Sequence, residues 1–390
     1  MVGHFGGQSA GIIPIHLRTG NPIGSGLRAR GRHLENSIRG GLNCQRRFVL
    51  PRPRSEAARS RCRKSPMIRE KNMPVIFLSE ADVERLLDMP VAIAAMQRAF
   101  SELAQQRAEN VPRQRAQAEG FVLHSMSATA QYLGLGGWKQ YTTTAHGAKF
   151  LVGLYRLATG ELVALVEANR LGQLRTGAVT GLAIQQLATA DARRVGILGS
   201  GWQAESQLEA ASVARPIERA FVFSRQPQRR AAFAEKMTNR LSIEVTAVDL
   251  PQQAVEGLPI VITATTSSSP VLDGNWLADG ALLCAVGSNW MHKAEVDTGA
   301  IQRATTIVCD DLSCCQQEAG DFRESLERGL FQWSQATPLA RIVADSAPPR
   351  RDGREIIFFK SVGMAIEDVA LGGRLLERSE QEQAGQSLPF

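Results

Sequence analysis

A glycine-rich turn in the middle of the chain has the residue types and spacing of a dinucleotide-binding site. The apolar residues 195–198 predict a short buried strand, which leads directly into Gly199-Ser200-Gly201-Trp202-Gln203-Ala204 and a helix over residues 204–213. Gly199 permits a tight turn, Gly201 lets the backbone approach a pyrophosphate, and Ala204 allows close helix–strand packing. N–H groups at the helix start favour phosphates. The residues expected to bind the dinucleotide are Gly199, Ser200, Gly201, Trp202 and Gln203.

The end of the following strand bears on the choice of cofactor. An acidic residue there would bind the ribose 2′-hydroxyl of NAD and repel the 2′-phosphate of NADP. This chain instead has Ser224-Arg225 after the predicted strand 220–223, with Arg229 and Arg230 one helical turn later. A hydroxyl beside a guanidinium suits a phosphate, which favours NADP(H). In the alternative, Arg225 is a solvated surface residue and the cofactor is NAD(H).

The elements around this turn predict two kinds of sheet. Strand-like segments at residues 75–78, 121–123, 138–144, 150–155 and 162–166, with helices at 79–87, 88–103 and 176–188, predict an α+β unit with a largely antiparallel sheet. Ser79 and Asp82 resemble a capping box that opens the first of these helices. After Asp191, strands at 195–198, 220–223, 260–263, 282–286 and 306–309 alternate with helices. This alternation is typical of a doubly wound α/β domain.

Charge separates the first 72 residues from the rest of the chain. The net charge is +7, but residues 1–72 alone hold 15 basic and three acidic residues, a local charge of +12, so the remainder sums to −5. The tail is rich in Gly, Arg, Ser and Pro, which predicts disorder. It is interpreted as translated upstream sequence with a natural start at Met73, as a targeting peptide, or as a nucleic-acid arm without the aromatic residues such an arm favours.

Other classes of protein are excluded by composition. No apolar run approaches the roughly 18 residues that span a bilayer, so no membrane association is expected. The six cysteines form no CxxC pair and no zinc spacing, so we expect no metal site and a reducing, cytoplasmic compartment.

Several separated stretches together resemble the ornithine cyclodeaminase/mu-crystallin family. They are Val111-Pro112-Arg113, Gly137-Trp138-Lys139, Arg175-Thr176-Gly177-Ala178-Val179, the glycine turn, Ala285-Val286-Gly287-Ser288-Asn289, Glu295-Val296-Asp297 and the segment from Phe359 to Asp368. The resemblance covers residues 73 to about 378. It implies a homodimer in which a Rossmann domain (191–315) is inserted into a substrate and dimerisation domain formed by residues 73–190 and completed by residues 316–390.

The resemblance also assigns roles to individual residues. Arg113 and Lys139 match positions that hold the substrate carboxylate, and a cleft that desolvates Lys139 would make it a proton donor as well. Val362 and Gly363 match the loop that lines the substrate pocket. The positions matching cofactor contacts are Arg175, expected at a helix start near the phosphates, and Thr265, Val286, Lys293 and Ser361.

Asn289 departs from the cyclodeaminases of the family, which have an aspartate at this position. Cyclodeamination needs a carboxylate to deprotonate an amine, and an amide cannot take that proton. We therefore expect an NAD(P)H-dependent reductase of cyclic or N-substituted α-imino acids such as pyrroline-2-carboxylate, in which Asn289 orients the substrate nitrogen. It would work in reverse as an amino-acid dehydrogenase. The alternatives are ornithine cyclodeaminase and a non-catalytic, crystallin-like NADP(H)-binding protein.

Overall fold

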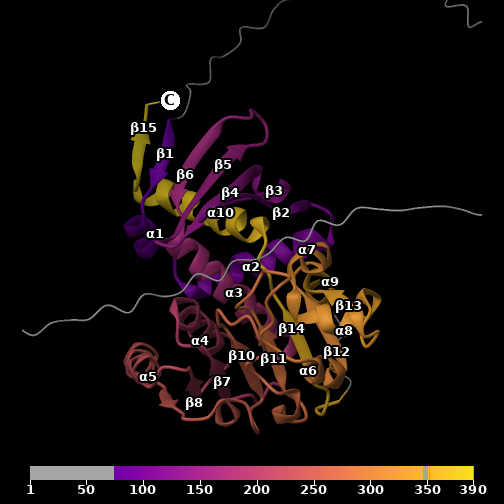
Figure 1. Ribbon diagram of the computed structural model, residues 1–390. Coiled ribbons are helices and arrows are strands. Elements are labelled where there is room, and N and C mark those ends of the chain that lie inside the picture. The colour runs from indigo at the N-terminus through magenta and orange to yellow at the C-terminus, as the bar shows by residue number, and fades with distance from the viewer. Residues whose placement is uncertain (1–73, 346–349, 351, 390) are drawn as a thin grey trace, which may run out of the picture. The chain divides into compact units, whose positions relative to one another are not determined.

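The structure is a computed structural model that describes residues 74–345, 350 and 352–389. The predicted tail over residues 1–72 lies outside the described residues. Two β-sheets organise the described part of the chain, each with helices packed against it (Figure 1). Within these ranges, no helix is long and apolar enough to cross a membrane.

The first sheet has seven strands in the order β15-β1-β6-β5-β4-β3-β2. Its strands are β1 (Val75–Leu78), β2 (Ala108–Ala118), β3 (Phe121–Ala130), β4 (Leu135–Thr144), β5 (Gly147–Arg156), β6 (Leu162–Glu167) and β15 (Gln386–Leu388). All neighbours are antiparallel except β1 and β6, which confirms the expected α+β unit. Strand β2 is not among the predicted strands, because Pro112 interrupts its pattern. As an edge strand with a register shift between Val111 and Gln114, it tolerates the proline.

The helices of this unit are α1 (Glu80–Leu86), α2 (Met89–Ala104), α3 (Asn169–Leu187) and α10 (Ala365–Glu382). The predicted capping box of Ser79 and Asp82 is present at the start of α1. Helix α3 begins seven residues before the predicted start at Thr176. Its own sequence offers no N-cap side chain, and the Glu80 carboxylate of α1 instead accepts hydrogen bonds from the N–H groups of Asn169 (2.6 Å) and Arg170 (2.8 Å).

Helix α3 is buried on nearly all sides, which explains why its sequence shows little amphipathic pattern. Its glycines bring neighbouring helices close. A Cβ on Gly177 would lie 2.5 Å from the Ser206 carbonyl oxygen of α4 (Trp202–Ala214), and one on Gly181 would lie 2.7 Å from Ile93 of α2. The helix is therefore a closely packed central element, and it carries Arg175.

The second sheet has eight parallel strands in the order β13-β12-β14-β11-β10-β7-β8-β9. The strands are β7 (Arg194–Leu198), β8 (Arg219–Phe223), β9 (Glu244–Ala247), β10 (Ile260–Thr263), β11 (Leu282–Ala285), β12 (Thr306–Cys309), β13 (Ala336–Pro338) and β14 (Ile357–Lys360). Together with the first sheet, this arrangement confirms a dinucleotide-binding α/β fold inserted into an α+β unit.

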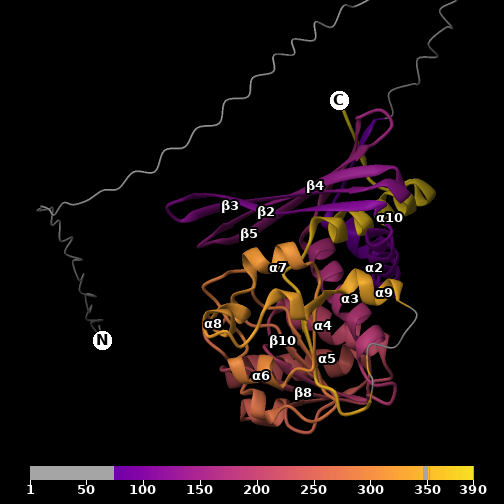
Figure 2. The same cartoon turned by 90° about the vertical axis from the view of Figure 1, so that its right-hand side faces the viewer.

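The boundary predicted at residue 315 differs from the one in the structure. Strands β13 and β14 belong to the parallel sheet, and β14 is an interior strand between β11 and β12. Among the described residues after 315, β15 pairs with β1 of the first sheet, and α10 packs along that sheet in both views (Figures 1 and 2). Lys360 ends β14 and α10 begins at Ala365, so the short loop between them links the two sheets next to the site.

Candidate active site

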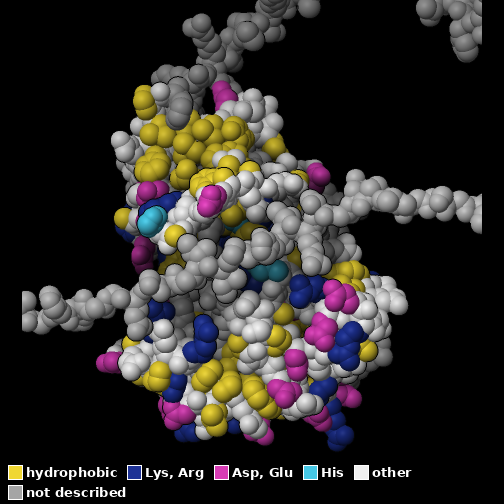
Figure 3. All heavy atoms as spheres, viewed as in Figure 1, with side chains coloured by type: hydrophobic (Ala, Val, Ile, Leu, Met, Phe, Trp, Pro, Cys, Tyr) yellow, Lys and Arg dark blue, Asp and Glu magenta, His cyan; other side chains and the backbone are white. Residues whose placement is uncertain are grey.

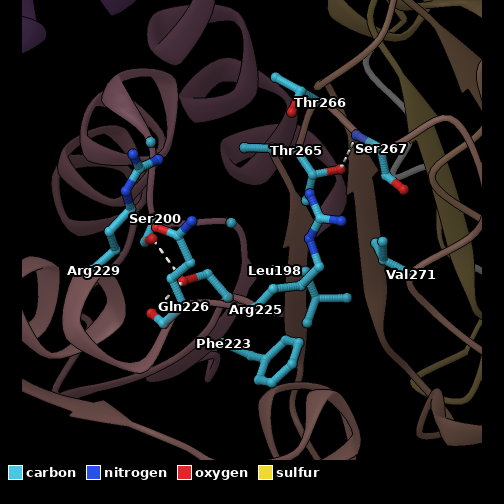
Figure 4. Close-up of a pocket in the computed structure, with 14 residues that line it drawn as sticks. Leu198, Ser200, Phe223, Arg225, Gln226, Arg229, Thr265, Thr266, Ser267 and Val271 are labelled. Atoms are coloured by element: carbon cyan, nitrogen blue, oxygen red, sulfur yellow. Dashed lines mark hydrogen bonds between the residues drawn. The ribbon is translucent and has the colours of Figure 1, made fainter. Parts of the chain in front are cut away.

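The predicted glycine turn lies at the carboxyl end of β7 and lines a cavity of about 570 Å³ (Figure 4). Gly199 has φ +119°, and a Cβ there would lie 2.4 Å from the Ala264 carbonyl oxygen, so glycine is required for the turn. A Cβ on Gly201 would meet nothing within 4 Å and would instead fill the open cradle. Within the part of the chain that the structure describes, no side chain caps α4, so its first N–H groups are left for a ligand. These features fit the pyrophosphate of a dinucleotide.

The side chains after β8 close one end of this cavity. Ser200 Oγ donates a hydrogen bond to Ser224 Oγ (2.8 Å), and Ser224, Arg225 and Arg229 line the cavity (Figure 4). Arg230 is not part of the lining. It is buried, and its guanidinium donates to the Ser224 carbonyl oxygen and pairs with Asp249. Two arginines and two hydroxyls thus remain for the ribose end of a dinucleotide.

A buried carboxylate fixes the loops after β10 and β11. Glu295 accepts hydrogen bonds from Thr265 N (2.7 Å), Thr265 Oγ1 (2.8 Å), Gly287 N (2.6 Å) and Thr263 Oγ1 (3.0 Å). Burial raises the pKa of Glu295 above its ordinary value. Thr265 consequently has a defined position between the two cavities of the site.

A second cavity, of about 500 Å³, opens beside the glycine turn and brings together residues from both sheets. Among the predicted site residues, the following line it: Arg113, Lys139, Arg175, Gly201, Trp202, Gln203, Thr265, Val286, Asn289, Ser361, Val362 and Gly363. The residues matched to substrate and those matched to cofactor therefore face one common space.

Lys139 lies on β4 and is almost fully buried. Its Nζ donates to Asp368 Oδ1 of α10 at 2.8 Å. Burial, together with the positive charge of Arg175, lowers the pKa of Lys139 to about 8, although the ion pair with Asp368 opposes this shift. A lysine with such a pKa can bind an anion and can exchange a proton near neutral pH.

Arg113 lies on β2 and is held by Glu318 and by the loop that contains Val362 and Gly363. Its Nη1 pairs with Glu318, and its Nη2 donates to the carbonyl oxygens of Val362 (3.1 Å) and Gly363 (3.2 Å). Arg115 pairs with the same Glu318 carboxylate at 2.7 Å. The guanidinium of Arg113 is thus fixed in orientation at the cavity wall.

Arg175 does not lie at a helix start and does not line the first cavity. It sits in the second turn of α3 and lines the second cavity beside Lys139. The expectation that Arg175 lies at a helix start was wrong, because Glu80 caps α3 at Asn169, seven residues before the predicted start at Thr176. Arg175 Nη1 pairs with Glu367 at 2.6 Å, and its Nε lies 3.3 Å from Asp368. Burial disfavours its charge, but Asp368 and Glu367 raise the pKa of Arg175 above its ordinary value.

The loop Ser361-Val362-Gly363 is held by a carboxylate that the sequence did not single out. Asp310, directly after β12, accepts hydrogen bonds from Ser361 Oγ (2.8 Å), Val362 N (2.7 Å) and Gly363 N (2.8 Å). Gly363 has φ +80°, and a Cβ there would lie 2.5 Å from Arg175 Nη1. The glycine is thus needed both for the turn and for the approach of Arg175.

Two residues near the loop after β11 do not reach the cavities. Lys293, predicted to contact the cofactor, lines neither of them, because its segment turns away after Trp290 and packs against Gly320. His292 is exposed and lines neither cavity. Asn289 does line the second cavity, and its carbonyl oxygen accepts from Arg115 Nη2 at 2.9 Å.

Sequence reasoning gave no site role to the acids that pair with the cations or to a row of aromatic residues. Nothing in the sequence around Glu318 marks it as the partner of Arg113. Tyr141 could have been found, because it follows Lys139 by two positions on a predicted strand and so points to the same face. The cations of the site with their acids are Arg113 with Glu318, Lys139 with Asp368 and Arg175 with Glu367.

The sequence of the chain is similar to those of known proteins. The sequence profile of the ornithine cyclodeaminase/mu-crystallin family matches residues 73–383. A Delta(1)-pyrroline-2-carboxylate reductase from Bacillus cereus is 28% identical over 329 residues, which cover 81% of this chain and 100% of the relative.

Solved structures show the same similarity. The Delta(1)-pyrroline-2-carboxylate reductase of Thermococcus litoralis, in complex with NADH and L-proline, superimposes with a TM-score of 0.77 at 30% identity, covering 80% of this chain and 100% of that one. An archaeal alanine dehydrogenase dimer with bound NAD gives a TM-score of 0.77 at 26% identity and covers 82% and 100% of the two chains.

Proposed function

The chain belongs to the ornithine cyclodeaminase/mu-crystallin family, and from this premise we infer that it is a nicotinamide-dependent oxidoreductase that reduces α-imino acids to amino acids. We propose cyclic or N-substituted imino acids, such as pyrroline-2-carboxylate, as its substrates. The similar reductase from Thermococcus litoralis has NADH and L-proline bound, which supports this class.

The observation that carries the proposal is the placement of Lys139, Arg113 and Arg175 around one cavity that borders the glycine turn. The three positive side chains can bind and orient one carboxylate, each held by a buried acid outside the cavity. A bound nicotinamide supplies the hydride when the imine is reduced and accepts it in the reverse direction.

The residues around the substrate supply position and protons. Binding of the carboxylate by Lys139 and Arg113 fixes the α-carbon relative to the glycine turn, which is the main requirement for hydride transfer. Lys139 exchanges a proton with the substrate nitrogen, because its pKa of about 8 lies near neutral pH. Asn289 lines the same cavity and orients the nitrogen through its amide.

The test is an assay of purified protein with pyrroline-2-carboxylate and reduced cofactor, monitored by cofactor oxidation. We expect turnover that is lost in Lys139→Ala, since this change removes both the carboxylate contact and the proton. Conversion of ornithine to proline and ammonia without net reduction of added NAD⁺ would instead establish a cyclodeaminase. Tight cofactor binding without turnover of any imino acid would establish a binding protein.

For the cofactor, we propose a preference for NADPH over NADH. Ser224, Arg225 and Arg229 line the cavity at the end of β8, and no acidic side chain lines that cavity in the described part of the chain. These groups suit a 2′-phosphate. We expect Arg225→Ala to raise the KM for NADPH at least tenfold while changing the KM for NADH little, and an equal effect on both cofactors would contradict the preference.

We also propose that the protein is a homodimer that buries the outer face of the first sheet. Leu151 pairs with Gln140, the neighbour of Lys139, and therefore points away from the cavity. Large hydrophobic side chains gather over the first sheet in Figure 3. The large hydrophobic side chains on or next to its strands that are 37–45% exposed are Val111, Phe121, Leu151, Tyr155 and Leu157. Patches of this kind mark protein interfaces. The mass measured by light scattering should be that of a dimer, and Leu151→Asp should shift it to the monomer.

Finally, we propose a cytoplasmic location. The cysteines within the described ranges, Cys284, Cys309, Cys314 and Cys315, are all free thiols and buried, as is usual in a reducing compartment. Fractionation of cells that express the full chain with a tag checks this, and recovery from an oxidising compartment would contradict it.

A further inference from the structure

One wall of the second cavity is a row of aromatic side chains from three neighbouring strands. His124 of β3, Tyr141 of β4 and Phe150 of β5 are direct cross-strand partners. The rings of His124 and Tyr141 stack with centroids 4.0 Å apart and an interplanar angle of 4°, and those of Tyr141 and Phe150 stack at 4.8 Å and 22°. We call these three residues the aromatic wall.

The aromatic wall lies directly beyond Lys139 along the sheet. Lys139 and Tyr141 are two positions apart on β4 and share one face, and Lys139 Nζ lies 5.3 Å from the centre of the Phe150 ring. A substrate whose carboxylate binds Lys139 must therefore direct its side chain or ring along this wall. Trp290, from the loop after β11, lies edge-on to His124 with centroids 5.8 Å apart and closes the same part of the cavity.

The charges around the aromatic wall are all positive. No Asp or Glu belongs to the lining of this cavity in residues 74–345, 350 and 352–389. Glu318 and Asp368, which pair with Arg113 and Lys139, do not line the cavity. A further cation, the Arg115 guanidinium, lies 4.3 Å from the centre of the Trp290 ring.

The lowered pKa of His124 shows that a positive charge is unfavourable at the aromatic wall. His124 is buried, and its Nδ1 has no hydrogen-bond partner among the described residues. Burial, with further contributions from Arg115 and Arg113, lowers the pKa of His124 to about 4. The ring is therefore neutral near pH 7, and a second cation brought to this wall would likewise lose its hydration and meet the charges of Arg115 and Arg113.

Building on the proposed function, we propose that His124, Tyr141, Phe150 and Trp290 determine specificity and select imino acids with an uncharged ring or side chain. Planar apolar rings gain by stacking on aromatic faces. An ω-ammonium group finds no acid to pair with among the described residues that line the cavity. The rings that could attract it are already approached by cations, Tyr141 and Phe150 by Lys139 and Trp290 by Arg115. The substrate class is therefore cyclic or apolar imino acids, and diamino acids are excluded.

The experiment measures kcat/KM in the direction of amino-acid oxidation for L-proline, L-pipecolate, L-ornithine and L-lysine. We expect the two cyclic amino acids to be oxidised at least 100-fold more efficiently than the two diamino acids. Oxidation of ornithine or lysine within tenfold of proline overturns the specificity but leaves the reductase function intact. Oxidation of none of the four, with no reduction of pyrroline-2-carboxylate, would refute the proposed function itself.

A matched pair of variants tests the electrostatic argument. Thr143 is exposed, lines the cavity and lies two positions beyond Tyr141 on the same face of β4, with its Oγ1 3.2 Å from His124 Nε2. Thr143→Glu places an acid at the end of the wall, and Thr143→Gln adds the same bulk without charge. We expect Thr143→Glu to raise the ornithine-to-proline ratio of kcat/KM at least tenfold above that of Thr143→Gln. Equal ratios in the two variants overturn the assignment.

A third variant tests the stacking. Phe150→Leu keeps an apolar side chain but removes one ring of the wall, so we expect it to lower kcat/KM for L-pipecolate about tenfold. His146→Ala, in the exposed turn between β4 and β5, is the control that should leave it unchanged. An unaltered value in Phe150→Leu would show that the wall does not contact the substrate ring.

Discussion

The ion pair between Lys139 and Asp368 is the contact on which the proposed chemistry of the site depends most. Asp368 Oδ1 lies 2.8 Å from Lys139 Nζ and 3.3 Å from Arg175 Nε, and all three side chains are buried. In Asp368→Asn, the shape of the site is kept while the negative charge is removed. Burial and the repulsion of Arg175 then still lower the pKa of Lys139, but the negative charge of Asp368 no longer opposes them.

The size of the effect follows from the burial of the pair. Removing one partner of a buried ion pair costs about 3–5 kcal/mol if the other stays charged. Because a shift of one pKa unit corresponds to about 1.4 kcal/mol, Lys139 avoids most of this cost by losing its proton. Arg175 keeps its ion pair with Glu367, so we use the lower end of this energy range, about 3 kcal/mol. This energy corresponds to a fall of roughly two units in the pKa of Lys139, from about 8.

The assay is the pH dependence of kcat/KM for imine reduction, which reports groups in the free enzyme. Lys139 binds a carboxylate only while it is protonated, so activity is present below its pKa and lost as the pH rises through it. The wild type should lose activity above a pH of about 8, and Asp368→Asn should lose it about two pH units lower. Glu367→Gln, which removes the neighbouring acid from Arg175 instead, should leave the alkaline limb in place. An alkaline limb in Asp368→Asn that is unchanged or moves to higher pH would refute the reasoning.

Three further predictions concern the cofactor turn, the fold and pH. Gly201→Ala should raise the cofactor Kd at least tenfold while changing the free energy of unfolding by less than about 1 kcal/mol, because its Cβ meets only open space; calorimetry and urea unfolding check this. Gly196→Ala should lose about 3 kcal/mol of stability by urea unfolding, because its Cβ would lie 1.8 Å from the Ala254 carbonyl oxygen; a loss below about 1 kcal/mol would contradict that packing. His124 binds its proton more weakly in the folded than in the unfolded chain, so its contribution to stability is lost as the pH falls from 6.5 to about 4. The wild type should therefore lose about 2 kcal/mol more than His124→Gln between about pH 7 and pH 5, and equal losses would refute this.

The sequence by itself determined the local parts of the protein. The turn from β7 into α4 could be predicted because its glycines, its apolar strand and its helix lie within a few residues of one another, and the same holds for the capping box of Ser79 and Asp82. Lys139 and Tyr141 share a face because of the two-residue period of a strand. Such features depend on backbone geometry and on neighbours in the chain, which a sequence displays directly.

Tertiary structure alone decided how the charges of the site are paired. Asp368 is 229 residues from Lys139 in the chain, and Glu318 is 205 residues from Arg113. The start of α3, and with it the place of Arg175, is fixed by Glu80 of another helix. Strand β14 is inserted between β11 and β12 in the parallel sheet although it follows both in the chain. These outcomes depend on which distant segments the fold packs together. Burial and the nearest opposite charge set the pKa and the orientation of an ionisable group. The residues next to that group in the sequence determine neither its burial nor its charged partner.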